Sequence, residues 1–339
     1  MKPSTSCLVL GNDWTALWVQ KCLRDLGVLA TTRWLNTPNE TGVLTAYVGN
    51  GETRGRTERT FGVGLTSTMW GLSERSHERV SNFLNAKKIP ATHKGAAWLE
   101  KSEAHSSIME FSAGSVWNRE DFVAALKADG GEGSAIDSIL KIEQKAPFDY
   151  AVKVQTGKRQ ETLRASAIFI ATERFARDLL PGLSSIWLPA TMNRFVFSST
   201  KDHPHSISLF HDGADFALRG PGSTVTVGSF RNLFEDRGYG IRPDWVDTYS
   251  QENVTKFFQG HGWIDGTTAP RVETWVESIS CDGLPIVGSL PAFPGIFLLA
   301  GFAGRTGNWI FETAFRLAQA FVSATPDPAL APLSPKRFA

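Results

Sequence analysis

The hydrophobic pattern at the start of the chain predicts a strand, a turn, a helix and a second strand. Residues 6–11 form an apolar run typical of a buried strand, and apolar positions between Thr15 and Leu26 recur at helical spacing. Gly27 stands where a helix C-terminal cap is expected. Residues from Val28 to about Trp34 predict the second strand. This order is typical of the opening of a dinucleotide-binding unit.

The rest of the pattern extends this motif and returns to it at the end of the chain. The run Ala167–Ala171 is continuously apolar, as in a strand covered on both faces. Residues 36–59 have a loop-like composition. Helices are expected at 68–86, 119–128, 243–258 and 309–322, and strands at 95–100, 150–156, 161–165, 194–199, 206–210, 224–230 and 295–300.

These elements predict an α/β protein of two domains. The first is a discontinuous Rossmann-like domain of the FAD/NAD(P) type, and the second is a mixed β-sheet substrate domain. We assign residues 1–45, 110–186 and 275–339 to the first domain, and residues 46–109 and 187–274 to the second.

Composition and charge narrow the classes of partner. The chain has 339 residues, of which 42% are hydrophobic and 20% charged, with a net charge of +1, so neither nucleic acid nor an anionic membrane is an expected partner. No apolar stretch approaches the roughly 20 residues of a membrane span. The apolar run Cys7–Leu10 is too short for a signal-peptide core, so a cytoplasmic location is expected.

The cysteines and histidines predict no metal site. Cys7, Cys22 and Cys281 have neither metal-ligand spacing nor a plausible disulfide pattern. Three histidines lie near one predicted strand without a suitably spaced carboxylate, and we interpret them as turn and surface residues: His203, His205 and His211.

The turn at residues 11–16 is the first candidate site. A dinucleotide fold has G-x-G-x-x-G/A there, and an acidic residue near the end of the second strand. Gly11 and Ala16 fit the first and third positions, but Asp13 replaces the glycine that lets the backbone approach a diphosphate. Arg33 and Trp34 stand where the acidic residue belongs. The residues alone leave open a nucleotide site, including Asn12, and a plain strand–helix turn.

The turn at residues 301–307 is the second candidate site. Gly301, Gly304 and Gly307 precede the last helix, so backbone N–H groups can face an anionic or carbonyl oxygen there. Tight strand–helix packing explains such a turn equally well.

Between these turns lies a segment through which the chain resembles a known family. Residues 280–288 read S-C-D-G-L-P-I-V-G, and Pro294–Gly295, then G-F-A-G-R at 301–305, follow in the same order as in the D-amino-acid oxidase and glycine oxidase flavoproteins. The tail at 330–338, L-A-P-L-S-P-K-R-F, is similar to the family's ending. Weaker similarities lie at 114–116 and at 167–183.

The resemblance implies FAD and the oxidation of a small amine or amino acid, with a hydride passing to the flavin. It also implies that the last helix faces the flavin through four residues: Gly304, Arg305, Thr306 and Gly307. The departures from the family pattern lie at positions where the family contacts its cofactor: Asp13, Arg33–Trp34, and Glu173 in place of a glycine. The stretch 275–279 lacks the arginine that binds the substrate carboxylate, for which Arg305 or Arg271 could substitute beside Glu277.

Three hypotheses follow. The first is a FAD-dependent amine or amino-acid oxidoreductase whose nucleotide loop has rearranged around Asp13. The second is a flavin-free relative that acts as a binding or assembly subunit with a partner subunit. The third is a pocket for another nucleotide or small molecule, with Arg33 as a phosphate contact.

Overall fold

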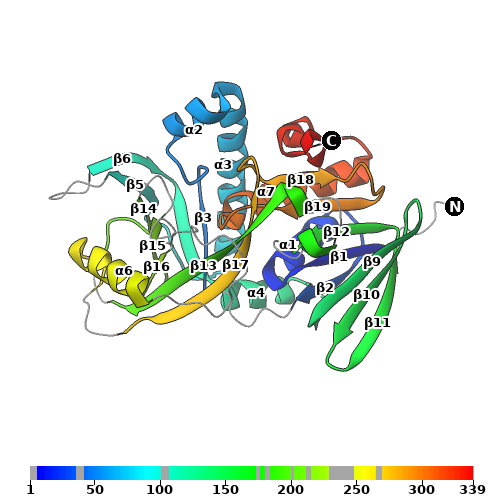
Figure 1. Ribbon diagram of the computed structural model, residues 1–339, viewed down its shortest axis with the longest axis horizontal. Coiled ribbons are helices and arrows are strands. Elements are labelled where there is room, and N and C mark those ends of the chain that lie inside the picture. Colours follow the sequence, from blue (N-terminus) through cyan, green and yellow to red (C-terminus); the bar gives the residue numbers. More distant parts are fainter. Residues whose placement is uncertain are drawn as a thin grey trace.

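A computed structural model of the chain describes residues 6–35, 42–100, 107–172, 176–179, 184–199, 202–210, 215–228, 248–264 and 269–338. Two large sheets and a layer of helices between them form the body of the molecule (Figure 1).

The first large sheet has six strands in the order β18-β19-β12-β1-β2-β8, all parallel except β18. Every residue of β12 is buried, as its continuous apolar pattern predicted. The strands are β1 (Cys7–Asn12), β2 (Ala30–Leu35), β8 (Ser134–Ile136), β12 (Ala167–Ala171), β18 (Ile286–Ser289) and β19 (Ile296–Ala300).

Both faces of this sheet are covered. Helices α1 (Asp13–Asp25) and α7 (Thr306–Ser323) pack on one face, where Val9 and Phe169 point. The other face, with Leu8 and Ile168, packs against a three-stranded antiparallel sheet. That sheet consists of β9 (Ser138–Ala146), β10 (Asp149–Thr156) and β11 (Arg159–Ala165).

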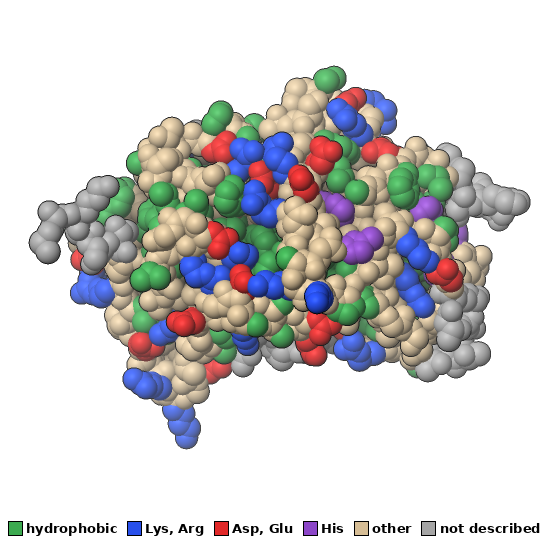
Figure 2. All heavy atoms as spheres, turned by 180° about the vertical axis from the view of Figure 1, so that it is seen from behind, with side chains coloured by type: hydrophobic (Ala, Val, Ile, Leu, Met, Phe, Trp, Pro, Cys, Tyr) green, Lys and Arg blue, Asp and Glu red, His purple; other side chains and the backbone are tan. Residues whose placement is uncertain are grey.

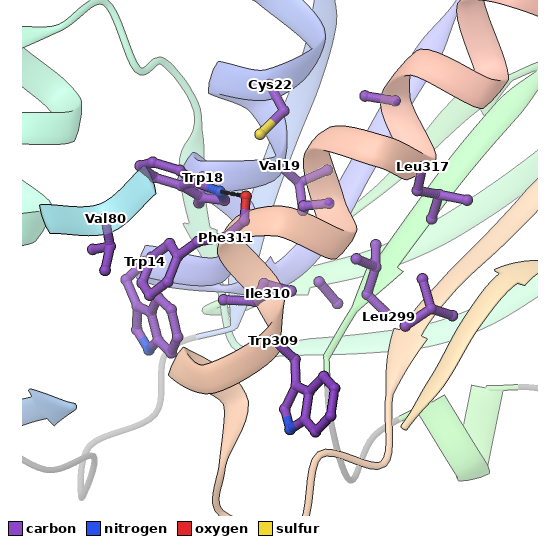
Figure 3. Close-up of a cluster of buried hydrophobic side chains, with 14 of the residues drawn as sticks. Trp14, Trp18, Val19, Cys22, Val80, Leu299, Trp309, Ile310, Phe311 and Leu317 are labelled. Atoms are coloured by element: carbon purple, nitrogen blue, oxygen red, sulfur yellow. Dashed lines mark hydrogen bonds between the residues drawn. The ribbon is translucent and has the colours of Figure 1, made fainter. Parts of the chain in front are cut away.

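Aromatic side chains join the helices into one core. Trp18 on α1 stacks on Phe122 of α4 (Arg119–Ala128), with ring centroids 6.1 Å apart, and its Nε1 donates to the carbonyl of Phe311 at 3.3 Å (Figure 3). The long helix α3 (Val63–Ala86) contributes Phe83 to this cluster. These contacts join α1, α3, α4 and α7 to one another.

The second large sheet has seven strands in the order β17-β13-β16-β15-β14-β5-β6. One face is covered by α6 (Thr248–Gly260), whose Phe258 packs with Phe195 and Phe210. The strands are β5 (Ala96–Glu100), β6 (Ser107–Ser112), β13 (Trp187–Ser198), β14 (Ile207–Phe210), β15 (Asp215–Arg219), β16 (Thr224–Gly228) and β17 (Arg271–Ser280).

Short elements connect the two large sheets. A small sheet, ordered β3-β7-β4, consists of β3 (Val43–Tyr47), β7 (Gly114–Asn118) and β4 (Ala91–Thr92). The other helices within the described residues are α2 (Arg54–Phe61), α5 (Ala176–Leu179) and three 3-10 turns at Ser184–Ile186, Pro328–Leu333 and Pro335–Phe338. Strand β3 runs beside the N-terminus of α7, which places it at the candidate site.

The predicted elements are mostly present, but the structure also has strands that the pattern did not predict, among them β6, β7, β9 and β17. The loop-like segment 36–59 contains β3 and the start of α2, because short strands and helices with few buried residues leave no clear periodicity. The domain boundaries stay a prediction, and those at 45/46, 109/110 and 274/275 fall inside β3, β6 and β17. His203 is buried and stacks on Trp263 at 3.8 Å, so its interpretation as a surface residue was wrong. His211 lies outside the described residues.

Two surface properties bear on partners. Within the described part of the chain, none of the helices combines the length and apolar character required to cross a bilayer. Lys and Arg side chains are interspersed with Asp and Glu side chains over the face shown in Figure 2, in keeping with a net charge of +1.

A pair of histidines around a buried serine predicts how stability depends on pH. His77 on α3 and His93 after β4 both contact the buried Ser115 hydroxyl, at 2.9 and 2.8 Å. Burial, followed by the nearby charge of His93, lowers the pKa of His77 from 6.5 to about 4. Because the folded-state pKa is below the unfolded one, His77 contributes stability that is complete above pH 6.5 and is lost as the pH falls toward 4.

We expect this loss to be about 2 kcal/mol, less than the full shift implies because His77 is partly accessible. Urea unfolding of the wild type and of His77→Gln at a series of pH values measures it. The variant should lose less stability on acidification, and equal slopes for the two proteins would contradict the prediction.

Candidate active site

The β1–α1 turn has the tight packing of a dinucleotide fold. A Cβ on Gly11 would lie 3.0 Å from the Cβ of Ala16 and 3.1 Å from the carbonyl oxygen of Ala171. The Thr15 hydroxyl accepts from the Asn12 N–H at 3.1 Å and donates to the Ala171 carbonyl at 3.0 Å. Gly11 and Ala16 therefore serve the close approach of strand to helix, which needs no ligand.

Asp13 is held by an arginine from another helix. Asp13 begins α1, and its Oδ2 lies 2.6 Å from Nη2 of Arg119, which begins α4; Oδ1 lies 3.3 Å from Nε. Oδ1 also accepts from the Trp14 N–H at 2.5 Å. Each side chain of the ion pair is only 18% exposed. Asp13 is recognisable from the sequence as an obstacle to a diphosphate, but its partner Arg119 is not, because it is 106 positions away in the sequence.

Trp14 and the end of β2 occupy the surroundings of this turn. The Trp14 ring is buried and lies 5.8 Å from the ring of Phe311 (Figure 3). Arg33 donates to the Thr32 carbonyl, and its Nη2 lies 3.5 Å from Oε2 of Glu161 on β11. Lys127 lies 5.3 Å from the ring centroid of Trp34. Arg33 is therefore turned toward the Glu161 carboxylate. Glu173, the third departure from the family pattern, lies outside the described residues.

The turn before α7 depends on left-handed backbone conformations. Gly301 and Gly304 have φ angles of +72° and +80°, which glycine adopts without strain. Thr306 begins the helix. A Cβ added to Gly307 would lie 1.8 Å from the carbonyl oxygen of Thr45, so the helix N-terminus and the backbone of β3 are in direct contact.

Asn308 reinforces this contact. Its Oδ1 accepts from the Tyr47 N–H at 3.1 Å, and its Nδ2 donates to the Gly49 carbonyl at 3.3 Å. Asn308 is fully buried. The sequence analysis did not identify Asn308, because an asparagine in a first helical turn carries no signal for a contact with a distant strand.

Arg305 lies at the junction of the helical layer and the seven-stranded sheet. A Cβ on Gly51 would fall 2.2 Å from its Nε, so its guanidinium covers that residue. Burial raises the pKa of the nearby Tyr47 hydroxyl, while the charge of Arg305 and a hydrogen bond from it act in the opposite direction. The Trp98 ring contacts Tyr47 edge-on at 5.8 Å.

Of the three predicted substrate residues, two lie together. The Glu277 carboxylate is buried, and its Oε1 is 3.5 Å from the position of a Cβ on Gly304, beside Arg305. Arg271 is at the other end of β17, where it is 67% exposed and pairs with Glu273 at 2.7 Å. The structure thus places Arg305 beside Gly51 and Tyr47 and Glu277 beside Gly304, around the same glycine-rich turn, and leaves Arg271 away from it.

At the position that the family resemblance implies, FAD would meet an obstacle at each of the two turns. At the first turn, the Asp13 carboxylate and its Arg119 partner stand where a diphosphate would meet the helix N-terminus. At the second turn, the helix that the resemblance places against the flavin is in contact with β3 instead. Binding of FAD in that position would therefore require the ion pair and the α7–β3 contact to open.

Comparison with known proteins identifies the fold. No protein-family model and no curated protein matches the chain. Glycine oxidase from Geobacillus kaustophilus superposes with a TM-score of 0.70 at 13% identity, covering 97% of this chain and 98% of that one. Iminodiacetate oxidase from Chelativorans sp. BNC1 gives 0.69 at 13% identity, with 97% and 98% covered. L-proline dehydrogenase from P. horikoshii gives 0.66 at 13% identity, with 98% and 97% covered.

These similarities confirm the predicted fold class. The chain has the α/β fold of the FAD-dependent amine and amino-acid oxidases along nearly its whole length. At this level of identity, the relationship is one of fold.

Proposed function

We propose that this chain is an oxidoreductase that acts on a small amine or amino acid and uses FAD. The observation that supports it most is the full-length similarity to oxidases and a dehydrogenase of such substrates. The group Arg305, Tyr47 and Glu277 lies where the glycine-rich turn meets the seven-stranded sheet. It offers both a cationic and an anionic side chain, which suits a small zwitterion.

The Asp13–Arg119 pair and the α7–β3 contact, here called the two closures, set the expected affinity for FAD. Opening both closures breaks the two hydrogen bonds of Asn308, at about 1 kcal/mol each, and the Asp13–Arg119 pair, at about 2 kcal/mol. A total of about 4 kcal/mol lowers the apparent affinity about 1000-fold. We therefore expect FAD to bind at micromolar rather than nanomolar concentration.

The Asp13–Arg119 pair and the α7–β3 contact also motivate a second candidate function, which the similarity to oxidases does not favour. In it the chain is a flavin-free binding or assembly subunit that keeps the fold, and Asp13, Arg119 and Asn308 replace cofactor contacts by contacts within the protein. The third hypothesis, a pocket in which Arg33 contacts a phosphate, has less support because Arg33 is turned toward Glu161.

Cofactor titration separates the two candidates. The purified full-length chain is titrated with FAD, riboflavin and AMP up to about 1 mM, a ceiling that still detects weak binding, with thermal shift and visible absorbance as readouts. Oxidoreductase function predicts micromolar FAD binding and bleaching of the bound flavin by some member of a panel of small amines and amino acids. A chain that takes up neither FAD nor riboflavin is the flavin-free subunit.

The two halves of FAD also report on the two closures. Uptake of riboflavin without AMP locates the obstruction at Asp13, and uptake of AMP without riboflavin locates it at the α7–β3 contact.

A further inference from the structure

The Asp13 carboxylate occupies a position that favours an anion for two independent reasons. It lies in the first turn of α1, where the free N–H groups and the helix dipole favour negative charge. It also faces Arg119, whose guanidinium binds it through two nitrogens at 2.6 and 3.3 Å. Because Arg119 begins α4, the ion pair joins the first turns of two helices.

The surrounding turn does not depend on Asp13. Gly11 and Ala16 keep the close packing of strand and helix, and the Thr15 hydroxyl bridges the Asn12 N–H and the Ala171 carbonyl. The anion position and its arginine are thus held by the fold, while the anion itself is a single side chain.

We infer that Asp13 is a built-in substitute for a bound diphosphate: the protein's own carboxylate fills the anion position between α1 and Arg119 and competes there with the diphosphate of a dinucleotide. The chain has kept the anion-binding position of its fold and has supplied the anion internally. The inference concerns the diphosphate position alone, so it holds whether or not the chain oxidises amines.

Substitution of Asp13 by the glycine of the motif tests the inference. The probe is inorganic pyrophosphate, which has the diphosphate of FAD without its adenosine and flavin parts. We expect Asp13→Gly to bind pyrophosphate at least about tenfold more tightly than the wild type in calorimetric titration at low salt. Arg119→Gln in the Asp13→Gly background should remove the gain, because it removes the freed guanidinium.

Two further variants keep the test decisive. Asp121→Gly makes the same change in net charge in the first turn of α4, where Asp121 bonds to Asn118, and should leave the affinity unchanged. Asp13→Asn removes the charge but keeps the side-chain volume, and serves if the glycine variant fails to fold; we expect a gain of about threefold. Folded Asp13 variants that bind pyrophosphate no better than the wild type, or an equal gain in Asp121→Gly, would overturn the inference.

Discussion

Replacing Gly307 by alanine is expected to destabilise the protein by about 3 kcal/mol. The added methyl group would lie 1.8 Å from the Thr45 carbonyl oxygen and 3.0 Å from its carbonyl carbon. Backbone cannot yield as the end of a flexible side chain does, so either β3 or the first turn of α7 must move. That movement also disturbs the two hydrogen bonds from Asn308. Chemical denaturation of the two proteins measures the difference.

A matched glycine provides the control. Gly64 is the second residue of α3, as Gly307 is of α7, and a Cβ there meets nothing within 4 Å. Gly64→Ala should be neutral or stabilise by up to about 1 kcal/mol, because alanine costs less backbone entropy in a helix. If Gly307→Ala behaves like Gly64→Ala, the α7 N-terminus is not closed against β3, and the expected thousandfold penalty on FAD no longer holds.

The local parts of this site could be predicted from the sequence. Gly11, Ala16 and the apolar run of β12 belong to short segments whose pattern reflects their own burial. The same holds for the glycine-rich turn, where Gly301 and Gly304 require positive φ. These signals are read within a few residues, and they led to the correct fold class.

The closing contacts could not be predicted, because each joins segments far apart in the chain. Nothing near Asp13 indicates that Arg119 binds it, and nothing near Gly307 indicates Thr45. Strand β3 has only five residues, and α2 buries only Thr57, so neither shows a clear hydrophobic period. The sequence therefore indicates that the cofactor positions have changed, while the replacement contacts emerge only from the fold.

Loss of the Glu312 carboxylate is expected to be the most damaging change of a charged residue. Glu312 lies on α7 with its side chain 2% exposed, and three arginines bind it. Its Oε1 is 3.1 Å from Nε of Arg75 and 2.6 Å from Nε of Arg316, and its Oε2 is 2.8 Å from Nη2 of Arg79. Arg75 and Arg79 belong to α3, so this one carboxylate joins the two helices that pack beneath the candidate site.

We expect Glu312→Ala to lower the free energy of unfolding by about 3 kcal/mol, since it leaves three guanidinium groups around an empty apolar position. The value is at the lower end for a buried ion pair because Arg75 and Arg79 are 43% and 33% exposed, and because Arg316 keeps Asp327 at 2.9 Å. Glu252→Ala is the control: Glu252 pairs with Lys256 at 4.0 Å on the surface of α6, and its loss should cost less than about 0.5 kcal/mol. Urea denaturation of both variants decides the matter, because a Glu312 variant as stable as the Glu252 variant would mean that α3 and α7 are held by their apolar contacts alone.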